Sequence, residues 1–319
     1  MKRSDLLKVK WTPYNSEPII SPPAGSPVIA DPTVLLPDES PDGQWHLFAH
    51  SIWGIHHYTS VDGITWGKPS FLFRNVMRAY IYQENNVYYL LYEKYRPLQI
   101  MVPWMRFWKW SSHIEMRASI DLVTWSGADT LVTPSLPWHG DPKLGRSISN
   151  PCLVKRNTSY LLYFSASLSF VPDCGFSEPR YIGVAKSDSI TGPYDINPEP
   201  LLSPDPTNAW CNLGAGSIKV IKTDDGFVGF QNGIYVDRVT GKSGSAIMMM
   251  DSYDGERWRQ MNTDPIVKPT AGWQRSHVYA CDVKYRASQK RYYLYYNARN
   301  DWHWTRGKEN IGLYYGEKK

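Results

Sequence analysis

Ser252-Tyr253-Asp254-Gly255-Glu256-Arg257-Trp258 is the third copy of a motif that also occupies residues 60–66 and 119–125. Each copy has serine, aspartate and tryptophan at its first, third and seventh positions. Two copies contain Asp-Gly, which favours a tight turn because glycine accepts a positive φ. A short apolar segment bounded by proline follows each motif, so the pattern predicts a turn that leads into an outer strand.

Two predicted strands precede each such turn or its equivalent, because runs of β-branched and aromatic residues bounded by turn residues are typical of strands. The first strands of these pairs cover residues 45–50, 87–93, 160–165, 226–232 and 291–298. The second strands cover residues 55–60, 114–119, 181–187, 246–252 and 311–316. A five-fold repeat of four-stranded units predicts an all-β, five-bladed β-propeller with antiparallel strands in each blade. A β-sandwich with chance similarity between its hairpins is the alternative.

Lys8-Val9-Lys10-Trp11 resembles the end of a repeat whose beginning is missing, and the C-terminal segment 310–316 stops where a further strand is due. We therefore expect residues 6–14 to complete blade 5 and to close the ring. On this basis residues 1–319 form a single domain, although length alone would suggest two.

Composition excludes several classes of partner. The net charge of +5 is modest and the basic residues are scattered, whereas nucleic-acid binding needs a concentrated basic face. The four cysteines lack CxxC spacing, so we expect no metal site of zinc-finger type. No apolar leader and no run of 18 apolar residues occur, so we expect a cytoplasmic protein without a membrane span and with reduced thiols.

The start of each innermost strand reaches the axis of a propeller, so side chains at these positions converge on one small space. Repeat alignment places four polar residues there, namely Asp31, Arg78, Asn150 and Asp282. Loops on the same face carry many tryptophans, which suit the C–H faces of sugar rings. These are Trp53, Trp104, Trp108, Trp110, Trp138, Trp210, Trp273, Trp302 and Trp304. Either they form a carbohydrate site or they pack the loops down.

Two segments resemble those of five-bladed propeller glycosidases of glycoside hydrolase family 43 and its relatives, families 32, 117 and 130. Val28-Ile29-Ala30-Asp31-Pro32-Thr33-Val34 is similar to their opening motif, and residues 181–194 are similar to their third-blade signature. The resemblance implies hydrolysis of a glycosidic bond with inversion. In that family one carboxylate is the general base, a second is the general acid, and a third acidic residue tunes the acid.

The match to the family's catalytic residues is incomplete. Asp31 matches the base, or else serves as a turn residue before Pro32. Asn150 stands where the family has the tuning aspartate, and Gly214-Ala215-Gly216-Ser217 stands where it has the acid glutamate. The general acid must therefore come from elsewhere in this chain.

Four residues are candidates for the acid or for orienting the substrate. Glu178, in a Glu-Pro dipeptide, is either the displaced acid or a solvated loop residue. Asp282 is axial by repeat alignment. Glu93 is either a site residue or the partner of Lys94 or Arg96. His277 is an acid, a ligand of an axial calcium or sodium ion, or a structural residue; no cofactor is otherwise expected.

Arg78 and Arg146 suit a carboxylate or phosphate on a substrate, because a guanidinium binds such groups through two hydrogen bonds. The leading hypothesis is an exo-acting glycosidase. The alternatives are a glycoside phosphorylase like those of family 130, a non-catalytic sugar-binding propeller and a glycosyl-transferring enzyme. The aromatic insert at residues 96–112 is either a lid or an oligomer contact.

Overall fold

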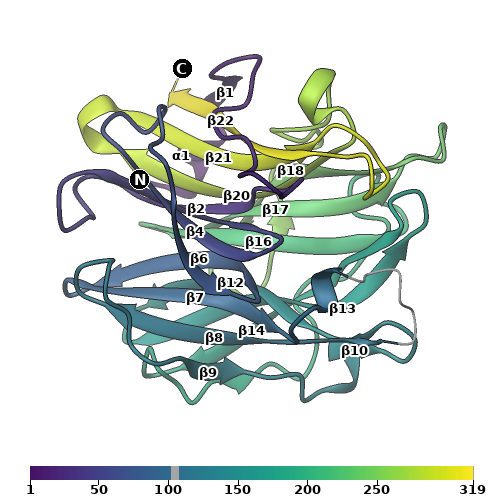
Figure 1. Cartoon of the computed structure of the whole chain (residues 1–319), viewed down its shortest axis with the longest axis horizontal. Coiled ribbons are helices and arrows are strands. Elements are labelled where there is room, and N and C mark those ends of the chain that lie inside the picture. Colours follow the sequence, from purple (N-terminus) through teal and green to yellow (C-terminus); the bar gives the residue numbers. More distant parts are fainter. Residues whose placement is uncertain (102–107, 319) are drawn as a thin grey trace.

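The computed structural model describes residues 1–101 and 108–318. It is an all-β ring of five sheets, so the predicted five-bladed β-propeller is confirmed (Figure 1). Trp104 and the other residues from 102 to 107 of the 96–112 insert lie outside the described residues. No helix in the described part of the chain is long and apolar enough to cross a membrane.

The strands of each blade follow the predicted order from the axis outward. The innermost strands are β2 (Ala30–Leu35), β6 (Val76–Glu84), β12 (Ile148–Arg156), β16 (Gly214–Thr223) and β20 (His277–Arg286). Each of them contacts the innermost strands of both neighbouring blades, which closes the ring. The second strands are β3 (Trp45–Ser51), β7 (Val87–Tyr95), β13 (Ser159–Val171), β17 (Gly226–Val236) and β21 (Arg291–Arg299).

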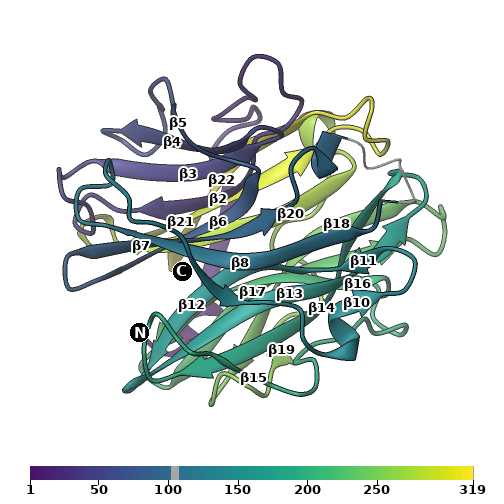
Figure 2. The same ribbon diagram turned by 60° about the horizontal axis from the view of Figure 1, so that its bottom comes forward.

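The outer half of each blade is less regular. The third strands are β4 (Gly54–Ser60), β8 (Trp110–Ser119), β14 (Phe176–Ser187), β18 (Ser243–Ser252) and β22 (Glu309–Lys318). The outermost strands are β5 (Ser70–Arg74), β9 (Asp129–Val132), β15 (Asp195–Ile196), β19 (Arg259–Gln260) and β1 (Val9–Pro13). Two short strands, β10 (Gly140–Asp141) and β11 (Gly145–Arg146), extend blade 2, and β11 lies parallel to β8 (Figure 2).

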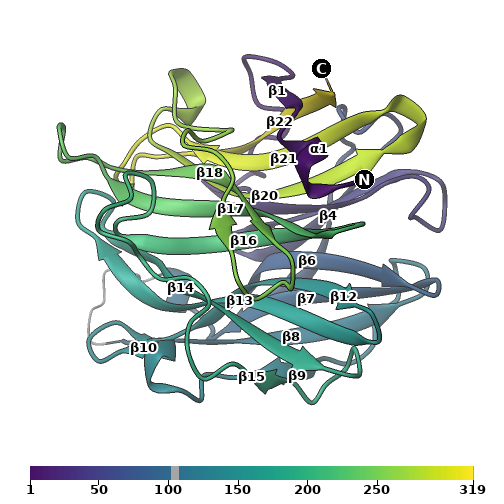
Figure 3. The same ribbon diagram turned by 180° about the vertical axis from the view of Figure 1, so that it is seen from behind.

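The N-terminal segment closes blade 5, as the split repeat predicted. β1 pairs antiparallel with the last strand, β22, so that Val9 lies opposite Lys318 and Pro13 opposite Tyr314. The one-turn helix α1 (Arg3–Leu6) packs at the junction of blades 4 and 5, where Leu6 joins a buried apolar cluster (Figure 3). The remaining helical elements are single 3-10 turns, namely η1 (Gln99–Met101), η2 (Pro137–His139), η3 (Gly272–Gln274) and η4 (Ala287–Gln289).

The core lies between the blades. One apolar cluster fills each junction of neighbouring blades. The repeat tryptophans help to build these junctions, because each packs edge-on against an aromatic ring of the preceding blade's second strand. The pairs are Trp11–Phe230, Trp66–Tyr295, Trp125–Phe48 and Trp258–Tyr163, with ring centroids 5.8 to 6.2 Å apart.

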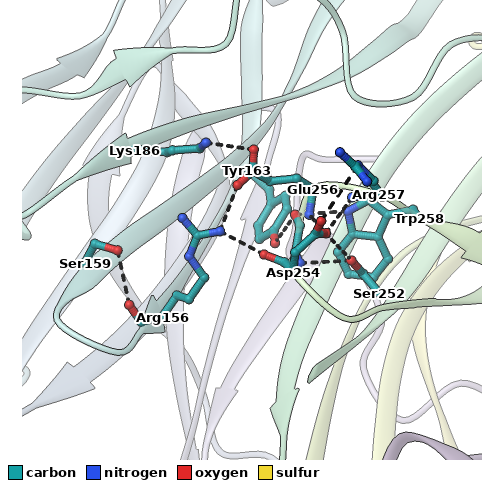
Figure 4. Close-up of polar contacts among 10 residues, drawn as sticks. Arg156, Ser159, Tyr163, Lys186, Ser252, Asp254, Glu256, Arg257 and Trp258 are labelled. Carbon is teal, nitrogen blue, oxygen red and sulfur yellow. Dashed lines mark hydrogen bonds and ion pairs between the residues drawn. The ribbon is translucent and has the colours of Figure 1, made fainter. Parts of the chain in front are cut away.

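The repeat turn also holds blades together through polar contacts, as the turn of blade 4 illustrates (Figure 4). Asp254 accepts hydrogen bonds from the backbone N–H groups of the residues that follow it. Glu256 binds Arg156 at 2.8 Å and Lys186 at 2.7 Å, both from blade 3. The Tyr163 hydroxyl, also in blade 3, donates to the carbonyl of Gly255 at 2.8 Å. The repeated spacing of the motif therefore places its side chains where they can contact the neighbouring blade.

Candidate active site

The same irregularity occurs at the start of all five innermost strands. In each blade the pairing between first and second strands shifts by one residue, which marks a β-bulge. Asp31, Arg78 and Asn150 take positive φ values of 51°, 54° and 48° at their bulges, and Gly216 has φ of 68°. A bulge bends its strand and re-aims the side chain. In blades 1, 2, 3 and 5 a bulge residue lines one axial cavity of about 1110 Å³, and in blade 4 the lining residue is Ser217, directly after the bulge.

In blade 5 the bulge residues are Tyr279 and Ala280, because the pairing shifts between Val278 and Cys281. The expected equivalence of Asp282 with Asp31 is therefore wrong by three residues. Asp282 does not line the cavity; it is buried between blades 1 and 5. Its carboxylate accepts hydrogen bonds from the Thr33 hydroxyl at 3.0 Å and from the N–H groups of Val34 at 2.8 Å and Val283 at 2.9 Å.

Glu178 reaches the cavity because the hairpin of β13 and β14 is longer than the sequence predicted. Glu178 pairs with Ser169 beyond the predicted ends of both strands, and its side chain is buried against the axis. The adjoining Pro179 lies over the start of blade 4, where a Cβ added to Gly214 would come within 2.6 Å of the Pro179 carbonyl oxygen. The Glu178 segment therefore fills the space in which a side chain from blade 4 would otherwise lie.

The carboxyl group of Glu178 is held in its neutral form at pH 7. Burial raises its pKa from 4.5 to about 8, and the negative charges of Glu309 and Asp31 add to this effect. The guanidinium of Arg78 opposes the increase without cancelling it. A buried carboxyl group with a raised pKa is suited to donate a proton to a bound molecule.

Asp31 faces the same cavity. Burial raises its pKa above 3.8, while the positive charges of Arg78 and Lys219 oppose the shift. Its Oδ2 lies 3.4 Å from Nδ1 of His50, whose pKa burial lowers to about 3, so that ring is neutral at pH 7. The Asp31 backbone N–H donates to Oδ1 of Asn297 at 3.1 Å. Asp31 is thus a positioned carboxylate without a full ion pair.

A third cavity carboxylate, Glu309, was missed at the sequence level. It lies at the start of β22 and accepts hydrogen bonds from Arg299 Nη1 at 3.0 Å and Asn297 Nδ2 at 3.1 Å. Burial raises its pKa, and Arg299 opposes that change. The available signal was that Asn297 lies at the end of one predicted strand and Glu309 just before the next, at the same end of the hairpin.

The predicted binding residues fall into two groups. Asn150 and Arg78 line the cavity, and Arg78 binds Glu93 behind the wall. Arg146 lies outside the lining and donates to the Leu136 carbonyl. Among the tryptophans, Trp108, Trp110 and Trp304 line the cavity. Those outside its lining are Trp53, Trp138, Trp210, Trp273 and Trp302.

The tryptophans outside the lining make contacts elsewhere or lie exposed on the surface. Trp273 donates to the Ser16 carbonyl, and Trp302 donates to the Ser243 carbonyl. Trp210 packs edge-on against Tyr235. Trp53 is 42% exposed on the surface. These four side chains therefore have no part in the axial cavity as the structure describes it.

The surroundings of His277 do not fit an axial calcium or sodium ion. Such ions prefer several oxygen ligands, whereas His277 is fully buried with Nε2 3.2 Å from the Ser243 hydroxyl and 3.6 Å from the Cys174 thiol. Within residues 1–101 and 108–318, no group of three or more His, Cys, Asp and Glu side chains is arranged to hold a metal ion.

No protein-family model matches the sequence, and no curated protein matches it. Solved structures do match the fold. A β-1,2-mannobiose phosphorylase from Listeria innocua, in complex with β-1,2-mannobiose, is 12% identical with a TM-score of 0.63 over 96% of both chains. A glycosyl hydrolase from Bacteroides ovatus is 16% identical with a TM-score of 0.63, over 94% of this chain and 92% of that one.

A third similar structure is an N-acetylgalactosamine deacetylase from F. plautii in complex with blood group B trisaccharide. It is 12% identical with a TM-score of 0.63, over 97% of this chain and 95% of that one. At such low identity the similarity establishes the fold and not the reaction. This chain therefore has the five-bladed β-propeller fold that these carbohydrate-acting proteins share.

Proposed function

We propose that this protein is a glycoside hydrolase that uses Glu178 as general acid and Asp31 as general base in the axial cavity. The observation that carries the proposal is the pair of buried carboxyl groups that face one cavity. One of them, Glu178, keeps its proton at pH 7 because its pKa is about 8. The similar structures, which include a glycosyl hydrolase, agree with a carbohydrate substrate.

In the proposed reaction Glu178 gives its proton to the glycosidic oxygen as the bond between that oxygen and the anomeric carbon breaks. A water molecule forms the new bond to the anomeric carbon and gives its proton to Asp31. The products are a reducing sugar and an alcohol, and the two carboxyl groups return to their starting states by exchanging one proton with solvent. Because water attacks opposite the leaving group, we propose inversion.

Exo action is part of the proposal. The five bulges surround the cavity from the axial side. A cavity that ends at the propeller axis suits the end of a glycan better than its middle.

Hydrolysis is favoured over phosphorolysis by the charges in the cavity. The two arginines that line it, Arg78 and Arg299, are already paired with Glu93 and Glu309. Asp31 adds a further negative charge, whereas Glu178 is neutral at pH 7 and the two lysines of the lining, Lys109 and Lys143, have exposed side chains. A phosphate dianion beside Asp31 would therefore meet the negative charge of that carboxylate and no unpaired guanidinium among the described lining residues.

The test is release of aryl alcohol from a panel of aryl pyranosides and furanosides, with and without phosphate. We expect phosphate-independent turnover that Asp31→Asn lowers by at least 100-fold, with the first sugar product in the inverted configuration by NMR. Asp129→Asn, at the exposed start of strand β9, is the matched control. Turnover only with phosphate would establish a phosphorylase. No turnover, with glycan binding retained, would establish a sugar-binding protein.

A further inference from the structure

Tyr279 occupies the blade-5 position that corresponds to Asp31 in blade 1, at the first residue of the bulge. Its side chain lines the axial cavity. Although the residue is only 8% exposed, its hydroxyl has no hydrogen-bond partner among the residues that the structure describes. A buried hydroxyl without a partner destabilises the folded state. The fold therefore maintains an unused hydrogen-bond donor at the cavity wall.

The ring of Tyr279 is held firmly. It stacks on the imidazole of His277 with centroids 5.3 Å apart and planes inclined by 9°. His277 is itself fixed by the Ser243 hydroxyl, 3.2 Å from Nε2. The position of the Tyr279 ring is thus set by packing.

Glu178 is the neighbour that lacks a donor. No hydrogen bond of standard distance and angle reaches its carboxyl group from the described residues, but the Tyr279 hydroxyl lies near enough for a weak side-chain hydrogen bond that lowers the pKa of Glu178. The protonated carboxyl group is neutral and tolerates burial. The carboxylate that forms when it gives up its proton is a buried anion, which a hydrogen-bond donor would stabilise. Arg78 supplies charge, but its Nη1 is bound to Glu93 at 2.7 Å.

We propose that Tyr279 is a positioning residue whose hydroxyl donates a hydrogen bond to the Glu178 carboxylate as that group protonates the leaving oxygen. This inference rests on the proposed hydrolase function. The hydrogen bond strengthens only as negative charge develops, so it stabilises the transition state more than the bound substrate. No proton is transferred from Tyr279; its O–H bond stays intact throughout.

The first test compares Tyr279→Phe with the wild type on the best aryl glycoside of the panel, made with a phenyl or a 2,4-dinitrophenyl leaving group. We expect kcat for the phenyl glycoside to fall by about 10- to 100-fold with KM nearly unchanged. The dinitrophenyl glycoside should react at the wild-type rate, because its leaving group needs no proton. Tyr163→Phe removes another buried hydroxyl, which binds Gly255 in a blade junction, and should leave both rates unchanged.

Equal losses for both leaving groups would overturn the proposal and assign Tyr279 to substrate binding. Unchanged kcat for both would overturn it as well. Both outcomes require measurable turnover. A second measurement, which needs no substrate, therefore tests the contact if the protein is not a hydrolase.

That readout is the titration of Glu178 itself, followed by ¹³C NMR of protein labelled at the glutamate carboxyl carbons. The Glu178 resonance is identified by its loss in Glu178→Gln. Removal of a donor that favours the carboxylate should raise the pKa of Glu178 in Tyr279→Phe above that of the wild type. An unchanged titration would refute the contact. A shifted titration in a protein that cleaves no glycoside would support the contact and reject the hydrolase.

Discussion

Arg78 donates a 2.7 Å hydrogen bond from Nη1 to Oε2 of Glu93, whose side chain is completely buried. Glu93 also accepts a hydrogen bond from the indole of Trp110 at 3.2 Å. The pair therefore anchors the guanidinium at the cavity wall, where its charge acts on both Asp31 and Glu178. Lys94 and Arg96, the partners considered from sequence, are neighbours in the chain but not the partners in the fold.

The first prediction concerns this ion pair. Glu93→Gln leaves the largely buried guanidinium without its partner, and loss of one member of a buried pair costs about 3 to 5 kcal/mol. We expect the free energy of unfolding in urea to fall by about 3 kcal/mol. Glu317→Gln, which breaks the exposed pair with Arg291, is the control and should change stability by less than about 1 kcal/mol. Equal effects of both variants would contradict the burial argument.

The second prediction is a bell-shaped dependence of kcat/KM on pH. Activity requires Asp31 without its proton, so the acid limb should lie above pH 3.8, because burial raises the pKa of Asp31. Activity also requires Glu178 with its proton, so it should decline as the pH rises through about 8. Steady-state rates from pH 4 to pH 10 test both limbs. An activity that persists unchanged to pH 10 would exclude Glu178 as the acid.

The third prediction concerns stability and needs no substrate. The folded protein holds the Glu178 proton up to about pH 8, whereas the unfolded chain releases it near pH 4.5. The stability linked to this proton is therefore full below pH 4.5 and is lost as the pH rises through about 8. Glu178→Gln cannot titrate, so its unfolding free energy should fall less between pH 5 and pH 9. We expect the difference to be on the order of a few kcal/mol.

Urea unfolding of both proteins at the two pH values provides the measurement. Asp129→Asn, an exposed carboxylate replaced by an amide, controls for the change in net charge. Parallel loss of stability in the wild type and in Glu178→Gln would show that Glu178 has an ordinary pKa. The proposed role as proton donor at neutral pH would then lose its physical basis.

The propeller could be predicted from the sequence because each repeat contains short sequence patterns that indicate turns and strands. Local structure is predicted by the Ser-x-Asp turn, the aromatic strands and the partial repeat at Trp11. Together these patterns located all five blades. Asp31, Arg78 and Asn150 were placed on the axis by the same repeat, and the structure puts all three in the cavity lining.

The other parts of the site depend on contacts that the repeat does not encode. A β-bulge adds one residue without a sequence signal, and Tyr279 and Ala280 lack the positive φ that marks the bulges of the first three blades. The repeat alignment placed Asp282 three residues beyond Tyr279, the true equivalent of Asp31. Glu309 and Arg299 lie at strand ends, and only the fold shows that they face Asp31. The long hairpin that carries Glu178 differs from the repeat and so could not be inferred from it.

The last prediction separates the two aspartates that the sequence placed together. Asp282 accepts three hydrogen bonds within the junction of blades 1 and 5. In Asp282→Asn at least one of these N–H or O–H donors must face the new amide NH₂ group, so we expect a loss of about 2 to 4 kcal/mol in stability. Turnover per folded molecule should remain within about twofold of the wild type, because Asp282 does not line the cavity.

Asp31→Asn should show the opposite pattern. Its carboxylate is buried without a full ion pair, and burial raises its pKa, so a neutral amide removes a charge that the fold tolerates poorly. Stability should stay the same or rise while turnover falls at least 100-fold. The free energy of unfolding in urea and kcat, measured for both variants, test the two opposite patterns. If Asp282→Asn lost turnover but kept its stability, the catalytic assignment would return to Asp282, and the bulge alignment of blade 5 would no longer explain the site.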